Sequence, residues 1–171
     1  TVLFRYPKAE CPVGITGTDL PLITGKGTFI KKSQNSILLI TTGGLIPEAV
    51  NAERILREGG VDIDIYNLRF IKPIDRVCIL EIINSYTVVF LIEDGYERSG
   101  IGEHISALLK DNNSNVSYSH KGIPEKFLTQ ALRSELLADC DLDGTGISNF
   151  IINNEEVILL SKKFTAVYNL V

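Results

Sequence analysis

The sequence predicts an α/β fold whose sheet is covered by helices on both faces. Strand-like apolar runs alternate, in the later part of the chain, with helical patterns of about ten to fourteen residues, which is typical of parallel β-α-β units. Two runs, SILLIT and TVVFLIE, are apolar almost throughout, as expected for strands buried on both faces. With 171 residues, the chain is long enough for one such domain with a substantial core.

Six segments carry the strand pattern of β-branched and aromatic residues bounded by polar or glycine-containing turns. They are residues 2–6, 28–30, 36–41, 61–67, 87–93 and 116–119. We expect a single domain over residues 1–171, in which residues 1–36 form an N-terminal connecting and edge segment.

Helical periodicity follows several of these strands. The first predicted helix begins at Ile46 and ends at Gly59 and Gly60, since glycine is common just after a helix end. The second begins at Pro73, which suits the first helical position, with Asp75 near its positive end. Its predicted inward residues are Val77, Cys78, Leu80 and Ile83.

Two further helices are predicted towards the end of the chain. One spans residues 100–110, and the other contains FIINNEEVILL, with an Asn and Glu interruption inside it. His104 is expected on the surface of the first of these, whereas His120 is expected in a loop at a strand end. With only two histidines in the chain, neither a metal cluster nor a Ser-His-Asp arrangement is indicated.

Composition limits the possible partners. The net charge is -4, which argues against nucleic acid, because its recognition needs a clustered basic surface. No apolar run approaches the roughly 20 residues that cross a bilayer, so we expect a soluble protein without a membrane partner. Residues 1–36 are locally cationic, with five Lys and Arg against two Asp and Glu, and an anion of phosphate size fits there.

The cysteines indicate a reducing compartment. Cys11, Cys78 and Cys140 are scattered and odd in number, so neither a disulfide framework nor a zinc site is predicted. The sequence contains no methionine, and we therefore expect it to be excised from a longer chain.

The stretch VFLIEDGYERSGIGEHIS, residues 89–106, has the layout of a nucleotide site: a strand, a turn with glycine and a helix start. It lacks the third glycine of G-x-G-x-x-G, and its acidic residues would repel a phosphate. A structural role is the better interpretation. The stretches FIKPID and IEDG are similar to parts of a receiver-type signalling domain, but they occur in the reverse order.

Read in order, FRYPK, PLITGKGTFIKK, ILLITTGGLIPEAVNAERIL, IDIYNLRFIKPID, VVFLIEDGYERSGIGEHI, KGIPEKF and LDGTGI cover nearly the whole chain. Together they resemble the C-terminal domain of the 1-deoxy-D-xylulose-5-phosphate synthases, which belong to the transketolase-like, thiamine-diphosphate-dependent enzymes. The C-terminal domains of transketolase and of the pyruvate dehydrogenase β subunit are the nearest alternatives. A free-standing nucleotide-binding or receiver-type module is the alternative from another functional class.

The resemblance implies a three-layer α/β/α fold with a mixed, mostly parallel five-stranded sheet in which one strand is antiparallel. It also implies a homodimeric parent transferase that condenses pyruvate with glyceraldehyde 3-phosphate, releasing CO2, in non-mevalonate isoprenoid synthesis. Thiamine diphosphate and Mg2+ would be held by the preceding domains of the parent. The present chain would carry no catalytic, cofactor or metal residue and would be inactive alone.

One substrate contact follows from the resemblance. The family Arg that closes an Arg-Tyr-Pro-Arg motif and helps to bind the substrate phosphate corresponds to Lys8 of RYPK, with Arg5 beside it in the motif. The alternative is that Lys8 is a solvated lysine after a strand. The family occurs in bacterial cytoplasm and in plastid-type organelles such as the apicoplast or chloroplast, so either location is expected for the parent.

Overall fold

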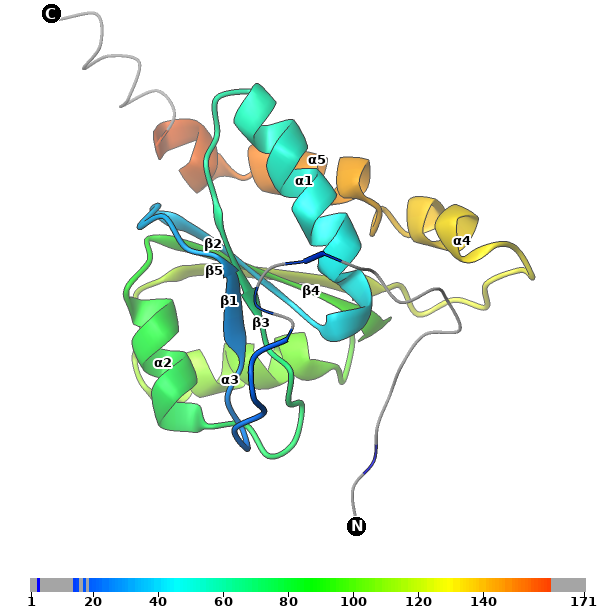
Figure 1. The fold of residues 1–171 in the computed structure, drawn as a ribbon. Helices are drawn as coiled ribbons and strands as arrows, with labels where there is room; N and C mark the ends of the chain where they lie inside the picture. The colour runs from blue at the N-terminus through cyan, green and yellow to red at the C-terminus, as the bar shows by residue number, and fades with distance from the viewer. Residues whose placement is uncertain (1–2, 4–13, 16, 18, 161–171) are drawn as a thin grey trace, which may run out of the picture.

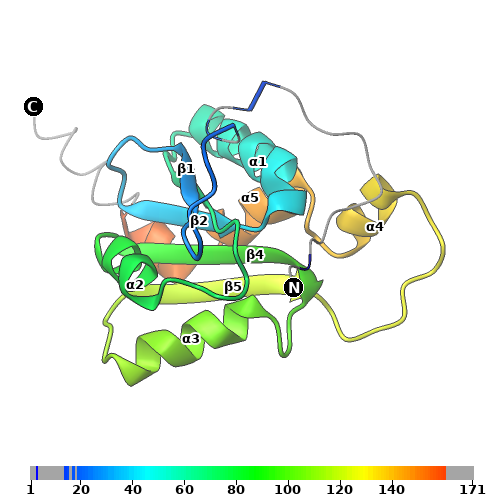
Figure 2. The same ribbon diagram turned by 60° about the horizontal axis from the view of Figure 1, so that its bottom comes forward.

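The computed structural model describes residues 3, 14–15, 17 and 19–160. Five strands form one sheet in the order β1-β3-β2-β4-β5, and helices cover both of its faces (Figures 1 and 2). Strand β1 runs antiparallel to β3, and the other neighbouring strands are parallel. The predicted mixed three-layer architecture is therefore confirmed. The strands are β1 (Thr28–Lys31), β2 (Ile37–Thr41), β3 (Asp64–Asn67), β4 (Val88–Tyr96) and β5 (Ser117–Ile123).

Five of the six predicted strands are present in the described residues, and the sixth, over residues 2–6, lies outside them. The placement of His120 in a loop was wrong. It lies within β5, opposite Leu91 of β4, because the parallel pairing continues past the polar residues at the end of the predicted run. Its ring stacks on Tyr118, with 5.9 Å between the ring centroids.

Two helical layers enclose the sheet. Helices α1 (Ile46–Glu58) and α5 (Gly144–Ile152) cover one face, and α2 (Arg76–Asn84) and α3 (Ile101–Asp111) cover the other (Figures 1 and 2). The short helix α4 (Arg133–Asp139), which the sequence analysis did not predict, precedes α5. As expected, α1 stops before Gly59, which caps its end, and His104 is exposed on α3.

The alternation of side chains along the central strands divides the apolar core in two. Ile37 and Leu39 of β2 contribute to the cluster under α1 and α5, whereas Leu38 and Ile40 contribute to the cluster under α2 and α3. Every residue of β2 is buried, as are the first six of β4. The prediction that these two strands are buried on both faces is confirmed, since period-two alternation sends side chains into both layers.

Helix α2 differs from its prediction at the start. It begins at Arg76 instead of Pro73, because the Asp75 side chain caps it by accepting a hydrogen bond from the Cys78 backbone N–H at 3.0 Å. Val77 lies in the first turn and is 67% exposed, so its predicted inward position was wrong. The buried residues of the helix are Ile79 and Ile83.

The predicted C-terminal helix is interrupted. Helix α5 ends at Ile152, and residues 155–160 are again helical. Between them, the Asn154 side chain accepts a hydrogen bond from the Glu156 backbone N–H at 3.0 Å. The Asn and Glu interruption therefore separates two helices, because asparagine competes for backbone groups that a continuous helix would use.

Candidate functional site at the carboxyl ends of the parallel strands

At the carboxyl ends of the neighbouring strands β2 and β4, the chain continues to opposite faces of the sheet. These strands are neighbours, and the helices that follow them, α1 and α3, cover opposite faces of the sheet (Figures 1 and 2). Open α/β sheets bind ligands at such a point. Here the hydroxyl of Thr42, the residue after β2, donates a hydrogen bond to the Asp94 carboxylate of β4 at 3.4 Å, so a side-chain contact already links the ends of the two strands.

The start of α3 is occupied by a carboxylate of the chain itself. Glu93 is only 5% exposed, and its two oxygens accept hydrogen bonds from the backbone N–H groups of Ile101 at 3.1 Å and Gly102 at 2.8 Å. These are the orphan donors of a helix N-terminus, where negative charge is favourable. A phosphate bound there would have to displace a buried, hydrogen-bonded carboxylate, which supports the structural interpretation of this turn.

The two glycines of this turn have packing roles. A Cβ on Gly100 would overlap the Glu93 carboxylate and would lie 2.5 Å from the Tyr96 carbonyl oxygen, and one on Gly102 would lie 2.5 Å from Cδ2 of His120. The Gly-x-Gly spacing thus lets α3 approach Glu93 and β5 closely.

Tyr118 supports the same helix start. Its hydroxyl donates a hydrogen bond to the Gly102 carbonyl oxygen at 2.9 Å. Burial, and secondly the negative charge of Glu93, raise the pKa of Tyr118. This tyrosine therefore stays a neutral donor over the range in which proteins function.

A second set of contacts lies at the end of β3. The Arg69 guanidinium donates hydrogen bonds to the carbonyl oxygens of Pro21 and Gly17, each at 3.1 Å. The Gly25 carbonyl accepts a hydrogen bond from the Asp75 backbone N–H at 3.0 Å. The stretches PLITGKG and RFIKPID are distant in sequence but contact each other here, and their contacts join the segment before β1 to the sheet.

The predicted phosphate-binding residues, Arg5 and Lys8, lie outside the described residues, so their role stays a prediction. Among the described cations of the same segment, Lys31 pairs with Glu53 at 2.5 Å and with Asp62 at 3.7 Å. Lys31 therefore serves the contact between β1 and the α1 side of the sheet.

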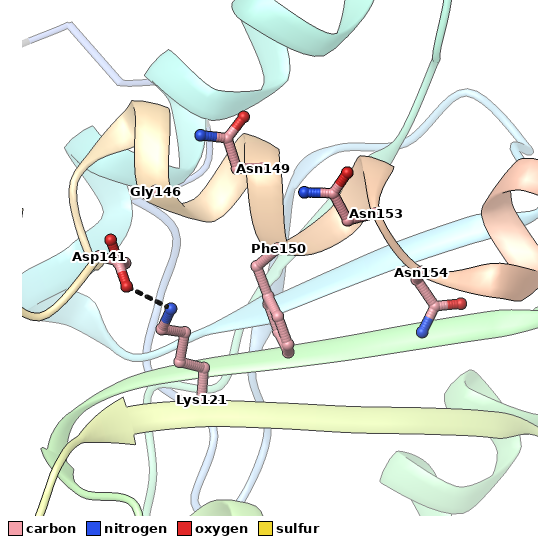
Figure 3. Close-up of a pocket in the computed structure, with 7 residues that line it drawn as sticks. All are labelled: Lys121, Asp141, Gly146, Asn149, Phe150, Asn153 and Asn154. Carbon is pink, nitrogen blue, oxygen red and sulfur yellow. Dashed lines mark hydrogen bonds and ion pairs between the residues drawn. The ribbon is translucent and has the colours of Figure 1, made fainter.

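Two cavities were not predicted from the sequence. The first, about 410 Å³, is called the asparagine groove and is lined by Lys121, Asp141, Gly146, Asn149, Phe150, Asn153 and Asn154 (Figure 3). The second, about 420 Å³, is lined by Tyr96, Arg98, Ser99, Glu125, Lys126 and Phe127. The one sequence signal for the first was the spacing of Asn149 and Asn153, which places both on one helical face.

The described residues do not fit a thiamine diphosphate or Mg2+ site. They contain no group of three His, Cys, Asp or Glu side chains arranged to hold a metal ion. The start of α3, which has the strand-turn-helix layout of a nucleotide site, already holds Glu93. In the same part of the chain, no helix is both long and apolar enough to cross a membrane.

Comparison with known proteins gives a consistent result. Residues 25–147 match the family model described as the transketolase C-terminal domain. The chain is 34% identical over 148 residues to the 1-deoxy-D-xylulose-5-phosphate synthase of Treponema pallidum (strain Nichols), a match that covers 86% of this chain and 24% of that protein. It is 29% identical over 155 residues to the enzyme of the same name from Pseudomonas fluorescens (strain Pf0-1), covering 90% and 24%. The resemblance predicted from the ordered motifs is therefore confirmed.

Solved structures share the fold. A split-gene transketolase described as an inactive beta4 tetramer superimposes with a TM-score of 0.69 at 19% identity, covering 79% of this chain and 44% of that one. Transketolase from Campylobacter jejuni gives a TM-score of 0.56 at 11% identity, covering 80% and 20%. The chain spans about a quarter of the length of the curated relatives that it matches.

Proposed function

Because this chain belongs to the transketolase C-terminal domain family, we propose that it is the C-terminal domain of a 1-deoxy-D-xylulose-5-phosphate synthase. Its parent is then a thiamine-diphosphate-dependent transferase that condenses pyruvate with glyceraldehyde 3-phosphate, with loss of CO2, for isoprenoid synthesis. The observation that carries this proposal is the 34% identity to the Treponema pallidum synthase over 86% of the chain.

Within that parent, the domain acts as a structural partner of the catalytic domains. The turn that resembles a nucleotide site in the sequence serves an internal contact here, because Glu93 holds the start of α3. Arg69 likewise makes an internal contact, to the segment before β1. Thiamine diphosphate and Mg2+ are assigned to the preceding domains, and the chain alone is inactive. The parent functions in bacterial cytoplasm or in a plastid-type organelle, and the relatives compared above are bacterial.

A domain exchange tests this proposal. We expect a Treponema pallidum synthase whose matching segment is replaced by this chain to form 1-deoxy-D-xylulose 5-phosphate, whereas the same replacement with a transketolase C-terminal domain gives no product. The isolated chain should consume no pyruvate and should show no thiamine diphosphate binding by calorimetry. The assignment would be contradicted if only the chimera with the transketolase domain formed product, or if the isolated chain bound the cofactor with micromolar affinity.

We expect Lys8 to contact the phosphate of glyceraldehyde 3-phosphate in the parent, with Arg5 beside it. Replacing Lys8 by alanine should remove a charged hydrogen bond of about 1.5 to 3 kcal/mol, roughly ten- to a hundredfold in kcat/KM. Steady-state kinetics with glyceraldehyde 3-phosphate and with a non-phosphorylated aldehyde acceptor measures this effect.

The two acceptors and a conservative variant provide the controls for Lys8. The loss should be confined to the phosphorylated acceptor, because only that acceptor has a phosphate to lose. Lys8→Arg should retain most activity, since the guanidinium also donates to phosphate oxygens. An equal loss with both acceptors, or no loss with either, would assign Lys8 to the solvated surface.

The parent is proposed to be a homodimer, and the chain should associate weakly through an apolar surface. The segment 20–27 contacts residues 69–75, and together with the start of α2 this region exposes Leu20, Leu22, Ile23, Ile71 and Val77. Exposed apolar groups of this kind mark interaction surfaces. We expect sedimentation velocity to show concentration-dependent self-association that Val77→Asp reduces.

A matched substitution on the other face provides the control for self-association. Val50 is also exposed, but it lies on α1, across the sheet from α2. Val50→Asp should leave the sedimentation profile unchanged. A strict monomer at millimolar protein, or an equal response to both substitutions, would contradict the assignment of this surface.

A further inference from the structure

The proposed function assigns no role to the asparagine groove. Lys121 lines it from β5, Asp141 from the turn before α5, Asn149 from α5 and Asn153 from the position that caps the end of α5 (Figure 3). It lies on the face of the sheet that α5 covers. Its volume of about 410 Å³ is within the range of small-molecule sites, about 300 to 1,000 Å³.

The two charges in the groove balance each other. The Lys121 ammonium lies 3.2 Å from Asp141 Oδ2, and the Lys121 side chain is only 22% exposed. A ligand with a net charge would be attracted by one of these groups and repelled by the other. A hydroxyl pair, in contrast, can accept a hydrogen bond from the ammonium and donate one to the carboxylate beside it.

The two asparagine amides have the same dual character. Asn149 lies in α5 and Asn153 caps its end, and the Asn153 backbone N–H donates a hydrogen bond to the Asn149 carbonyl at 3.1 Å. Residues four apart on a helix have Cβ atoms roughly 5 to 6 Å from each other on one face. Both residues are exposed, and both line the groove. Each amide offers a carbonyl acceptor and an NH2 donor, so each can bind a vicinal pair of hydroxyl groups.

An aromatic ring lies between the polar groups. The Phe150 ring packs edge-to-face on Phe90, with 5.4 Å between the ring centroids, and the Lys121 ammonium lies 5.6 Å from its centroid. The core thus holds the ring in place on one side while it lines the groove on the other. Such a ring supplies an apolar contact for the C–H groups of a ligand.

We propose that the asparagine groove binds a neutral polyhydroxylated molecule about the size of a monosaccharide. Balanced charge, paired amides and a fixed aromatic ring together match the alternating hydroxyl and C–H groups of such a molecule. The groove lies on the α5 side of the sheet, and its Lys121 is paired with Ile92 near the carboxyl end of β4. The proposal does not depend on the proposed function of the parent.

An NMR titration of the full chain with methyl α-D-glucopyranoside tests the proposal. This probe has no free aldehyde that could react with Lys121. Saturable shifts are expected in the side-chain NH2 signals of Asn149 and Asn153, with a millimolar dissociation constant. Methyl glucosaminide, which is cationic, and methyl glucuronide, which is anionic, should each bind more weakly. Tighter binding of either charged probe, or shifts that do not saturate, would overturn the proposal.

Variants locate the binding to the groove. Asn149→Ala, Asn153→Ala and Lys121→Met should each weaken binding at least fivefold. Asn115→Ala, which alters an exposed asparagine just before the start of β5, should leave it unchanged. Because Asn149 and Asn153 are exposed, their substitution should preserve the backbone spectrum. Equal affinity in the Asn149→Ala/Asn153→Ala double variant and in Asn115→Ala would exclude the groove as the site.

Discussion

Replacing Glu93 by alanine is expected to lower the free energy of unfolding by about 3 to 5 kcal/mol, because two buried N–H groups at the start of α3 lose a charged acceptor. Urea denaturation followed by circular dichroism measures the loss. Glu93→Gln should cost less, since the amide keeps one acceptor but loses the negative charge at the helix N-terminus.

Glu103 provides a matched control at the same helix start. Its carboxylate accepts a hydrogen bond from the Ser99 backbone N–H at 2.8 Å, but this bond is exposed to solvent. Glu103→Ala should therefore cost about 1 kcal/mol or less, because water can replace the lost acceptor. A smaller loss for Glu93→Ala than for Glu103→Ala would contradict the assigned role of Glu93.

The Glu93→Ala variant also shows what the turn can bind. Acetate has the size of the deleted group, and it should stabilise this variant while leaving the unmodified chain unaffected, because the helix N-terminus becomes an anion site only when Glu93 is removed. Stabilisation of the unmodified chain by acetate or phosphate would mean that the turn binds anions after all.

The second large effect is expected at Asp64, which is fully buried at the start of β3. Its carboxylate accepts hydrogen bonds from the Ser33 backbone N–H at 2.9 Å, the Asn35 side chain at 2.8 Å and the Tyr86 hydroxyl at 2.8 Å. Asp64 thereby joins the turn between β1 and β2 to Tyr86, which lies between α2 and β4. Asp64→Ala should cost about 3 to 4 kcal/mol, since buried charge-assisted bonds are lost together with packing.

A double-mutant cycle separates the contributions at Asp64. Burial, and secondly the hydrogen bond to Asp64, raise the pKa of Tyr86, so this tyrosine remains a neutral donor. Tyr86→Phe should cost about 1.5 to 2 kcal/mol alone and less in the Asp64→Ala background. Asp62→Ala is the control, because the Asp62 side chain is 59% exposed in its pair with Lys31 and should contribute less than about 1 kcal/mol.

Equal losses for Asp64→Ala and Asp62→Ala in urea denaturation would contradict the proposed network. So would a Tyr86→Phe cost that is the same in both backgrounds, because coupled groups are expected to be non-additive.

The strand pattern was predictable because it depends on local sequence. Continuous apolar runs can be buried on both faces only in a covered sheet, and β2 and β4 fulfil this prediction. The end of α1 before Gly59 was predictable for the same reason, since helix termination depends on adjacent residues. The family was also recognisable, because several modest stretches occur in a fixed order.

The errors have a common origin in contacts between distant residues. His120 is a strand residue because β4 pairs with it, whereas the residues after it, Lys121 and Gly122, are typical of a turn at a strand end. Val77 is exposed because α2 begins at its Asp75 cap and turns Ile79 and Ile83 towards the sheet. Local periodicity specifies neither the strand with which a segment pairs nor the side on which a helix packs against the sheet.

The sequence by itself determined the α/β class, the two doubly buried strands and the membership of a transketolase-like family, because these depend on residue order and hydrophobic pattern. Only the tertiary structure showed which group accepts the hydrogen bonds of the free N–H groups at the start of α3. Glu93 was identified there as an acid that would repel phosphate, but only the packing of α3 against β4 shows it as the buried anion that the helix start requires. The asparagine groove likewise exists only because the fold brings Lys121 of β5 beside Asn149 of α5, two elements that α4 and its flanking loops separate in the sequence.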